Sequence, residues 1–220
     1  MKPVVARTFL TLVALFAVVG PSAPRAASLP PEIRPTGMVV GGPLGWQRMC
    51  ARTPEWCAPA PARQSLVLNA VNRALLATVQ GEINAAIRPI EEPPGRDEWL
   101  LAPAEGDCED YALTKRMRLI EAGVPAGSLY FAVVLTERGE YHTVLFLDTT
   151  EGTWVLDNRL EDPVPWPRLR DRGGYRLLMA ELPGSGEWRA TDDGLALVLQ
   201  RLLLGAGGDA VTASVTWTAR

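Results

Sequence analysis

Residues 107–158 change their hydrophobic period once, and this change constrains the fold more than any other feature of the sequence. After Asp107, apolar residues recur at steps of three and four, which predicts a helix with Asp107 as its N-cap. Gly123 ends this helix, and a period of two then predicts three strands, at 129–136, 141–148 and 153–158. The turns between the strands are too short for a crossover, so an antiparallel meander must follow the helix. We therefore expect an α+β fold.

The flanking segments are less constrained. Residues 28–63 are rich in Pro and Gly and are interpreted as an irregular leader, whereas 65–87 have the apolar spacing of a helix capped by Ser65. Residues 175–182 are a candidate fourth strand. The segment 190–205 is typical of a C-terminal helix opened by Asp192 or Asp193, although part of it also fits a buried strand.

The N-terminus has the pattern of a secretory signal peptide over residues 1–27. Lys2 and Arg7 precede an apolar run that is too short to span a bilayer comfortably, and Ala27 supplies a small residue at the expected cut. An uncleaved anchor is the alternative. With cleavage, residues 28–220 form a single exported domain with no remaining membrane span. The net charge of -3 gives no basic surface for nucleic acid.

Export makes disulfides possible, and the chain has three cysteines. Cys50 and Cys57 are close in sequence and can close a short loop, which leaves Cys108 as a free thiol. The alternative is that all three are reduced. An unpaired cysteine in an exported protein is a candidate reactive group.

Cys108 has potential partners for nucleophilic chemistry. The helix start favours the thiolate and lowers the pKa of Cys108, while Asp107, Glu109 and Asp110 oppose this by charge repulsion. His142 is the only histidine, which excludes a multi-histidine zinc site. Antiparallel neighbours can bring its imidazole beside Asp157, which would orient it as a base for the thiol. Each residue also has an ordinary structural explanation as core filler or turn former.

The sequence resembles the bacterial transglutaminase-like cysteine proteinases in three consecutive segments, GDCEDYALTKRMRLIEAGVP, YHTVLFLD and TWVLDN. This is a periplasmic family that includes the LapG-like adhesin proteases. The resemblance to this family extends upstream to the segments MCARTPEWC, NAVNRAL and RDEWLLAPAEG. It therefore covers about residues 44–170. It implies a papain-like/transglutaminase-like α+β fold with the nucleophile helix packed on an antiparallel sheet. It also implies a Cys108–His142–Asp157 triad and calcium binding by Asp107 and Glu109, with Asp110 as a further candidate.

The same resemblance implies a periplasmic thiol protease that acts on a protein substrate, such as a surface adhesin, under control of a membrane receptor. Two other functions use the same residues differently. One is acyl transfer by a transglutaminase or amidase, and the other is a catalytically silent binding module that keeps the fold.

Overall fold

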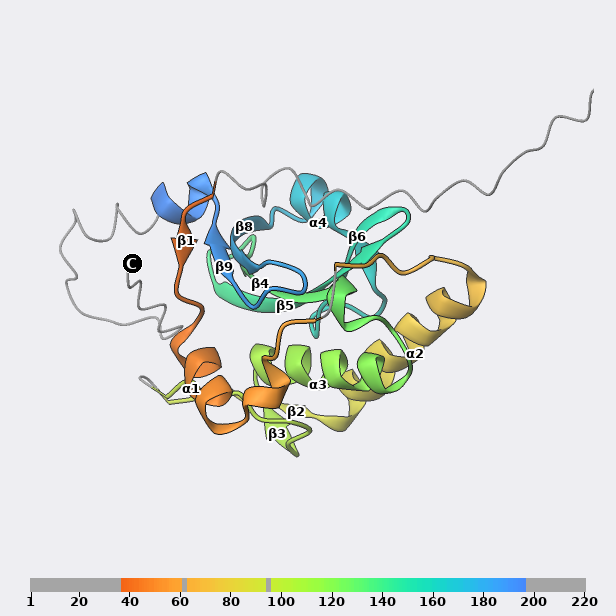
Figure 1. Cartoon of the computed structure of the whole chain (residues 1–220), viewed down its shortest axis with the longest axis horizontal. Helices are drawn as coiled ribbons and strands as arrows, with labels where there is room; N and C mark the ends of the chain where they lie inside the picture. The colour runs from red at the N-terminus through yellow and green to blue at the C-terminus, as the bar shows by residue number, and fades with distance from the viewer. Residues whose placement is uncertain (1–36, 61–62, 94–95, 197–220) are drawn as a thin grey trace, which may run out of the picture.

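A computed structural model describes residues 37–60, 63–93 and 96–196, which build around one antiparallel sheet (Figure 1). The strands lie in the order β1-β9-β8-β4-β5-β6-β7. Their bounds in this order are Val39–Val40, Trp188–Ala190, Arg176–Glu181, Leu129–Leu135, Tyr141–Thr149, Gly152–Leu156 and Val164–Pro165. A separate short parallel pair joins β2 (Arg88–Pro89) to β3 (Glu105–Gly106).

Helices cover both faces of the sheet. Three lie on one face, namely α1 (Leu44–Arg52), α2 (Ala70–Ala86) and α3 (Cys108–Glu121), and α4 (Trp166–Arg172) lies on the other (Figure 1). The short 3-10 helices η2 (Pro54–Trp56) and η3 (Ala126–Ser128) connect elements. This arrangement confirms the predicted α+β class, with α3 packed against β5.

Strand β4 is buried along its whole length because both of its faces are covered. Phe131 and Val133 join the core beneath α2 and α3, whereas Tyr130 and Val134 join a second cluster beneath α4. Apolar burial on both faces fixes the register of β4, since a one-residue slip would exchange the two sets of side chains.

A buried ion pair also joins α3 to the sheet. Arg116 of α3 pairs with Glu181 of β8 at 2.8 Å, and both side chains are buried.

The meander and its preceding helix form as predicted. Helix α3 begins at Cys108 after the N-cap Asp107, and Asp110 closes a capping box by accepting a hydrogen bond from Asp107 N at 3.2 Å. Gly123 follows the helix with a φ of 88°, a left-handed conformation that glycine adopts without strain. The strands β4, β5, β6 and β8 all match expected segments and pair antiparallel.

Two predictions on the N-terminal side were wrong. The leader is not irregular throughout, because its described part contains β1 and α1. Helix α2 begins at Ala70 rather than after Ser65, since Asn69 Oδ1 caps it by accepting a hydrogen bond from Asn72 N at 2.8 Å. The buried residues of α2 are Leu76, Val79, Gln80 and Ile83, whereas the apolar Val71 of the same helix is 75% exposed.

The two chain ends lie largely outside the described residues. Residues 192–196 are helical, and Thr191 Oγ1 caps them by accepting a hydrogen bond from Gly194 N, instead of the expected Asp192 or Asp193. The remainder of the predicted C-terminal helix and the predicted signal peptide at 1–27 lie outside the description. Within 37–60, 63–93 and 96–196, none of the helices combines the length and apolar character that crossing a bilayer requires.

Candidate active site

Cys108 opens α3 beside β5, an interior strand of the sheet. Its sulfur accepts a hydrogen bond from the backbone N–H of Thr143 on β5 at 3.3 Å. Strand β6 pairs with β5 only from Leu145 onward, so Thr143 lies beyond that ladder. Cys108 is a half-buried residue with a free thiol, and its sulfur sits beside the backbone of the residue that follows His142.

His142 and Asp157 meet where β6 ends. The imidazole Nε2 lies 2.8 Å from Asp157 Oδ1, and both side chains are buried. Burial opposes ionisation of Asp157, yet the hydrogen bond and charge of His142 hold the pKa of this carboxyl below its usual value. The ionised carboxylate accepts a hydrogen bond from Nε2–H, so Nδ1 is the ring nitrogen left to exchange a proton with another group.

Other side chains hold this pair in place. The Tyr175 hydroxyl donates to Asp157 Oδ2 at 3.0 Å, and the tyrosine ring packs edge-on against the imidazole. From α2, Gln80 Nε2 donates to the backbone carbonyls of Asp157 and Leu160, each at 3.0 Å. The sequence analysis missed Tyr175 and Gln80, because nothing in their local sequence distinguishes them from core residues.

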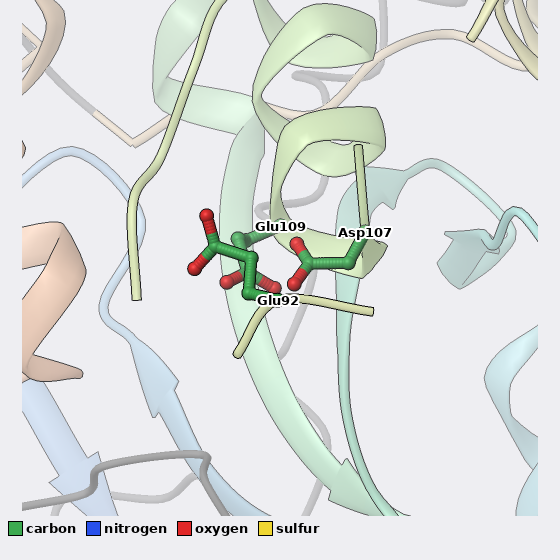
Figure 2. Close-up of side chains that lie close together, drawn as sticks. All are labelled: Glu92, Asp107 and Glu109. Atoms are coloured by element: carbon green, nitrogen blue, oxygen red, sulfur yellow. The ribbon is translucent and has the colours of Figure 1, made fainter. Parts of the chain in front are cut away.

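Three carboxylates converge at the start of α3 (Figure 2). Glu92, Asp107 and Glu109 each bring one oxygen within 4.8 Å of the others, and all three are at least partly buried. Asp107 Oδ1 is buried and has no hydrogen-bond partner among the described residues. Hard oxygen donors in this arrangement suit a divalent cation such as calcium. Glu92 was missed from sequence, since it comes from a loop far from α3.

Asp110 is placed differently from the other acids. Its carboxylate accepts hydrogen bonds from Leu100 N at 2.6 Å and from Asp107 N at 3.2 Å. A Cβ on Gly106 would clash with this carboxylate, which explains the glycine of the GDCED string. Asp110 therefore braces the turn before Cys108 and does not belong to the three-carboxylate cluster.

The expected lowering of the Cys108 pKa is wrong. Burial raises the pKa of the thiol well above its usual value, and the charges of Glu109 and Asp107 add to this effect. The thiol also donates to Glu109 Oε2 at 3.1 Å. Desolvation and two nearby carboxylates thus outweigh the helix start and the Thr143 N–H.

These groups share one open pocket of about 550 Å³. Cys108, His142 and Thr143 form part of its lining, together with Trp99 and all three carboxylate residues of the cluster. The thiol and the imidazole therefore face a common space that is large enough for several residues of an extended peptide.

A cysteine at the start of a helix packed on an antiparallel sheet defines the transglutaminase-like class of cysteine enzymes. The family model of the bacterial transglutaminase-like cysteine proteinases matches residues 36–194, so the chain belongs to this family and is a cysteine peptidase with a protein substrate. This match confirms the family recognised from sequence.

Solved structures of LapG from Legionella pneumophila are similar to this chain. The calcium-bound form is 20% identical over 61% of this chain and 82% of its own, with a TM-score of 0.47. Another LapG structure is 21% identical over 62% and 81% of the two chains, with a TM-score of 0.45. The EGTA-treated form is 22% identical over 52% and 64%, with a TM-score of 0.44. A search of curated proteins finds no match.

Proposed function

We propose that this peptidase hydrolyses peptide bonds with Cys108 as nucleophile, His142 as general base and acid, and Asp157 as the group that orients the imidazole. The observation that carries the proposal is the 2.8 Å contact between His142 Nε2 and Asp157 Oδ1 beside a free thiol in the same pocket. A thiol, a base and an orienting carboxylate are the three groups that covalent acyl transfer requires.

The chemistry follows from these positions. His142 Nδ1 takes the Cys108 proton as the sulfur attacks the scissile carbonyl carbon, and the carbonyl electrons move to oxygen. Backbone N–H groups at the start of α3 donate to this oxyanion. Collapse of the intermediate breaks the C–N bond, and the leaving amine takes the proton from His142. Water, deprotonated by His142, then attacks the thioester and releases the acid and the thiol.

We assign the cluster of Glu92, Asp107 and Glu109 as a calcium site, with Asp110 as a brace for its neighbours. The unpartnered Asp107 Oδ1 and the all-oxygen donor set fit such an ion. A bound cation would supply positive charge beside Cys108. Glu109 and Asp107 supply the negative charge there, and Glu109 accepts a hydrogen bond from the Cys108 thiol.

The proposed setting is the periplasm, reached through the signal peptide at 1–27, and the proposed substrate is a surface adhesin. A membrane receptor that sequesters the enzyme is the proposed regulator. These assignments rest on the family resemblance. The open pocket supports only the coarser part, a substrate that is an extended segment of protein.

The test uses a large surface adhesin of the same organism as the candidate substrate. The enzyme should cut the adhesin at a defined peptide bond in the presence of calcium, and Cys108→Ala should not cut it while retaining its far-UV spectrum. A labelled primary amine is included in a parallel reaction. Incorporation of the label without cleavage would overturn hydrolysis in favour of acyl transfer, and cleavage by Cys108→Ala would overturn the nucleophile.

A further inference from the structure

The turn that follows β6 carries residues of the active site. Leu160 N donates to the backbone carbonyl of Asp157 at 3.2 Å, which closes the turn. Asp157, its first residue, presents the carboxylate to His142, and its two central residues, Asn158 and Arg159, line the pocket. The position of this turn, called here the Asp157 turn, therefore affects both the orientation of the imidazole and one wall of the pocket.

Helix α2 binds the Asp157 turn at both of its ends. Gln80 Nε2 donates to the backbone carbonyls of Asp157 and Leu160, each at 3.0 Å. One helical turn further along, Asn84 Nδ2 donates to the same Leu160 carbonyl at 2.9 Å. Because these carbonyls belong to the first and the last residue of the turn, three hydrogen bonds from one helix attach the whole turn to α2.

The two amides have a polar character that the core itself does not require. Gln80 is 0% exposed and lies between the apolar residues Val79 and Ile83 in the list of buried residues of α2. The side-chain oxygens of Gln80 and Asn84 are buried and have no hydrogen-bond partner among the described residues. A buried amide is costly unless it is hydrogen-bonded, so donation to the turn is the compensation that the described contacts provide.

Helix α2 lies outside the active-site pocket. Within the described part of the chain, it contributes no residue to the pocket lining. Its amides therefore act on the site only through the turn that they bind. A turn that shifts by a fraction of an ångström would displace the carboxylate from the imidazole, and small displacements of this kind reduce catalytic rates strongly.

We propose that Gln80 and Asn84 are positioning residues, which fix the Asp157 turn against α2 and thereby hold the Asp157 carboxylate at the imidazole of His142. The hydrogen bond from Arg159 N to Asp157 Oδ1, at 2.8 Å, shapes the turn but does not attach it to α2. Without the amides, the turn keeps its internal hydrogen bonds and is free to move, which loosens the contact of 2.8 Å between Asp157 Oδ1 and His142 Nε2. The proposal rests on the proposed roles of His142 and Asp157.

The test replaces Gln80 with methionine, which is similar in size and has no N–H to donate. Because His142 is the only histidine, the ring nitrogens of ¹⁵N-labelled protein report its tautomer without ambiguity. Wild type should show a neutral ring with its proton on Nε2, whereas Gln80→Met should move both nitrogen signals toward the average of the two tautomers. We also expect kcat on the adhesin that wild type cuts in calcium to fall about tenfold.

Two further variants sharpen this comparison. Asn84→Leu should change the ring signals and kcat in the same direction by a smaller amount, because Gln80 still binds both carbonyls of the turn. Val79→Ala is the matched control, since it removes buried contacts from the neighbouring position of α2 and no hydrogen bond to the turn. It should lower the melting temperature and leave the ring signals and kcat as in wild type.

Wild-type ring signals in Gln80→Met would overturn the proposal, as would equal changes of these signals in Val79→Ala. If Gln80→Met does not fold, unchanged ring signals in Asn84→Leu would overturn it instead. The NMR measurement needs no substrate. Altered ring signals in variants of a protein that cuts no adhesin would therefore disprove the proposed function and leave the positioning of Asp157 by α2 supported.

Discussion

The carboxylate of Asp97 accepts a hydrogen bond from the backbone N–H of Gly45 at 2.6 Å. This contact joins the first turn of α1 to the lining of the active-site pocket, across 52 positions of sequence. The same helix carries Cys50, whose disulfide to Cys57 closes the following turn. The segment formed by α1 and the Cys50–Cys57 disulfide loop is thus attached to the active-site pocket through the buried carboxylate of Asp97.

Gly45→Ala should therefore disturb the pocket. A Cβ at position 45 would clash with the Asp97 carboxylate, so we expect a loss of stability of about 1 to 3 kcal/mol in denaturant titrations. Gly81→Ala is the matched control, because nothing lies within 4 Å of a Cβ at this exposed position in α2. It should instead stabilise the protein by roughly 0.5–1 kcal/mol. Equal effects of the two variants would contradict the assigned contact.

Asp157→Asn should reduce turnover while the fold is retained. The asparagine amide can donate to Nε2, which favours the imidazole tautomer with its proton on Nδ1, and this tautomer cannot accept the thiol proton. We expect kcat to fall by roughly 10²–10⁴-fold in steady-state assays. Asp162→Asn, at an exposed position of the same loop, should keep wild-type kcat. A change in KM alone for Asp157→Asn would argue against the orienting role.

Calcium should change how stability depends on pH. Burial raises the pKa values of Glu92, Asp107 and Glu109, so the cation-free folded state binds more protons than the unfolded state. The stability of this state should fall as pH rises through and above the ordinary carboxyl range. Calcium should remove this fall, as measured by denaturation midpoints in calcium and in EGTA.

Glu92→Gln tests the ligand that sequence alone did not predict. Its loss removes one carboxylate of three, so the rise in melting temperature on adding calcium should become smaller. Glu91→Gln removes the neighbouring exposed acid and should respond to calcium like wild type. A full calcium response in Glu92→Gln would exclude this residue from the site.

The contribution of Lys115 to folding stability should depend on pH in the opposite direction to that of the carboxylate cluster, and over a higher pH range. Its pKa is lowered by burial from 10.5 to about 7, so between these values the unfolded chain holds a proton that the folded chain lacks. Wild-type stability should rise with pH across this window, and each pKa unit corresponds to about 1.4 kcal/mol. Lys115→Met should be the more stable protein at pH 6, with an advantage that shrinks toward pH 10. A constant difference in denaturation midpoints would contradict this assignment.

Local signals explain why residues 107–158 were predictable. A capping aspartate, a terminating glycine and short turns act over a few residues each, and they determine α3 and the meander. Helix α1 has no such signal, because Pro43 occupies its N-cap and provides no side-chain hydrogen bond. Asn69, rather than the expected Ser65, caps α2, and both residue types are common N-caps, so the local sequence did not decide between them.

The candidate site was predictable only in part, because local sequence signals do not reveal contacts between distant parts of the chain. The order of Cys108, His142 and Asp157 along a helix and two paired strands implied their proximity, and the structure brings His142 and Asp157 into contact. Tyr175, Gln80 and Glu92 reach the site through contacts that span distant parts of the chain. The Cys108 pKa depends on the degree of burial, which no local pattern reveals.

The order of strands in the sheet has a consequence for synthesis. Strand β4 pairs on one side with β5, the next strand in the sequence, and on the other side with β8, which begins some forty residues later. Strand β1 pairs with β9, which lies near the end of the described residues. Tyr175, which holds Asp157, immediately precedes β8. An emerging chain that has already released Cys108 and His142 therefore still lacks the partners that complete the sheet and fix the carboxylate. The nascent peptidase should therefore remain inactive until the chain has been made through β8 and β9.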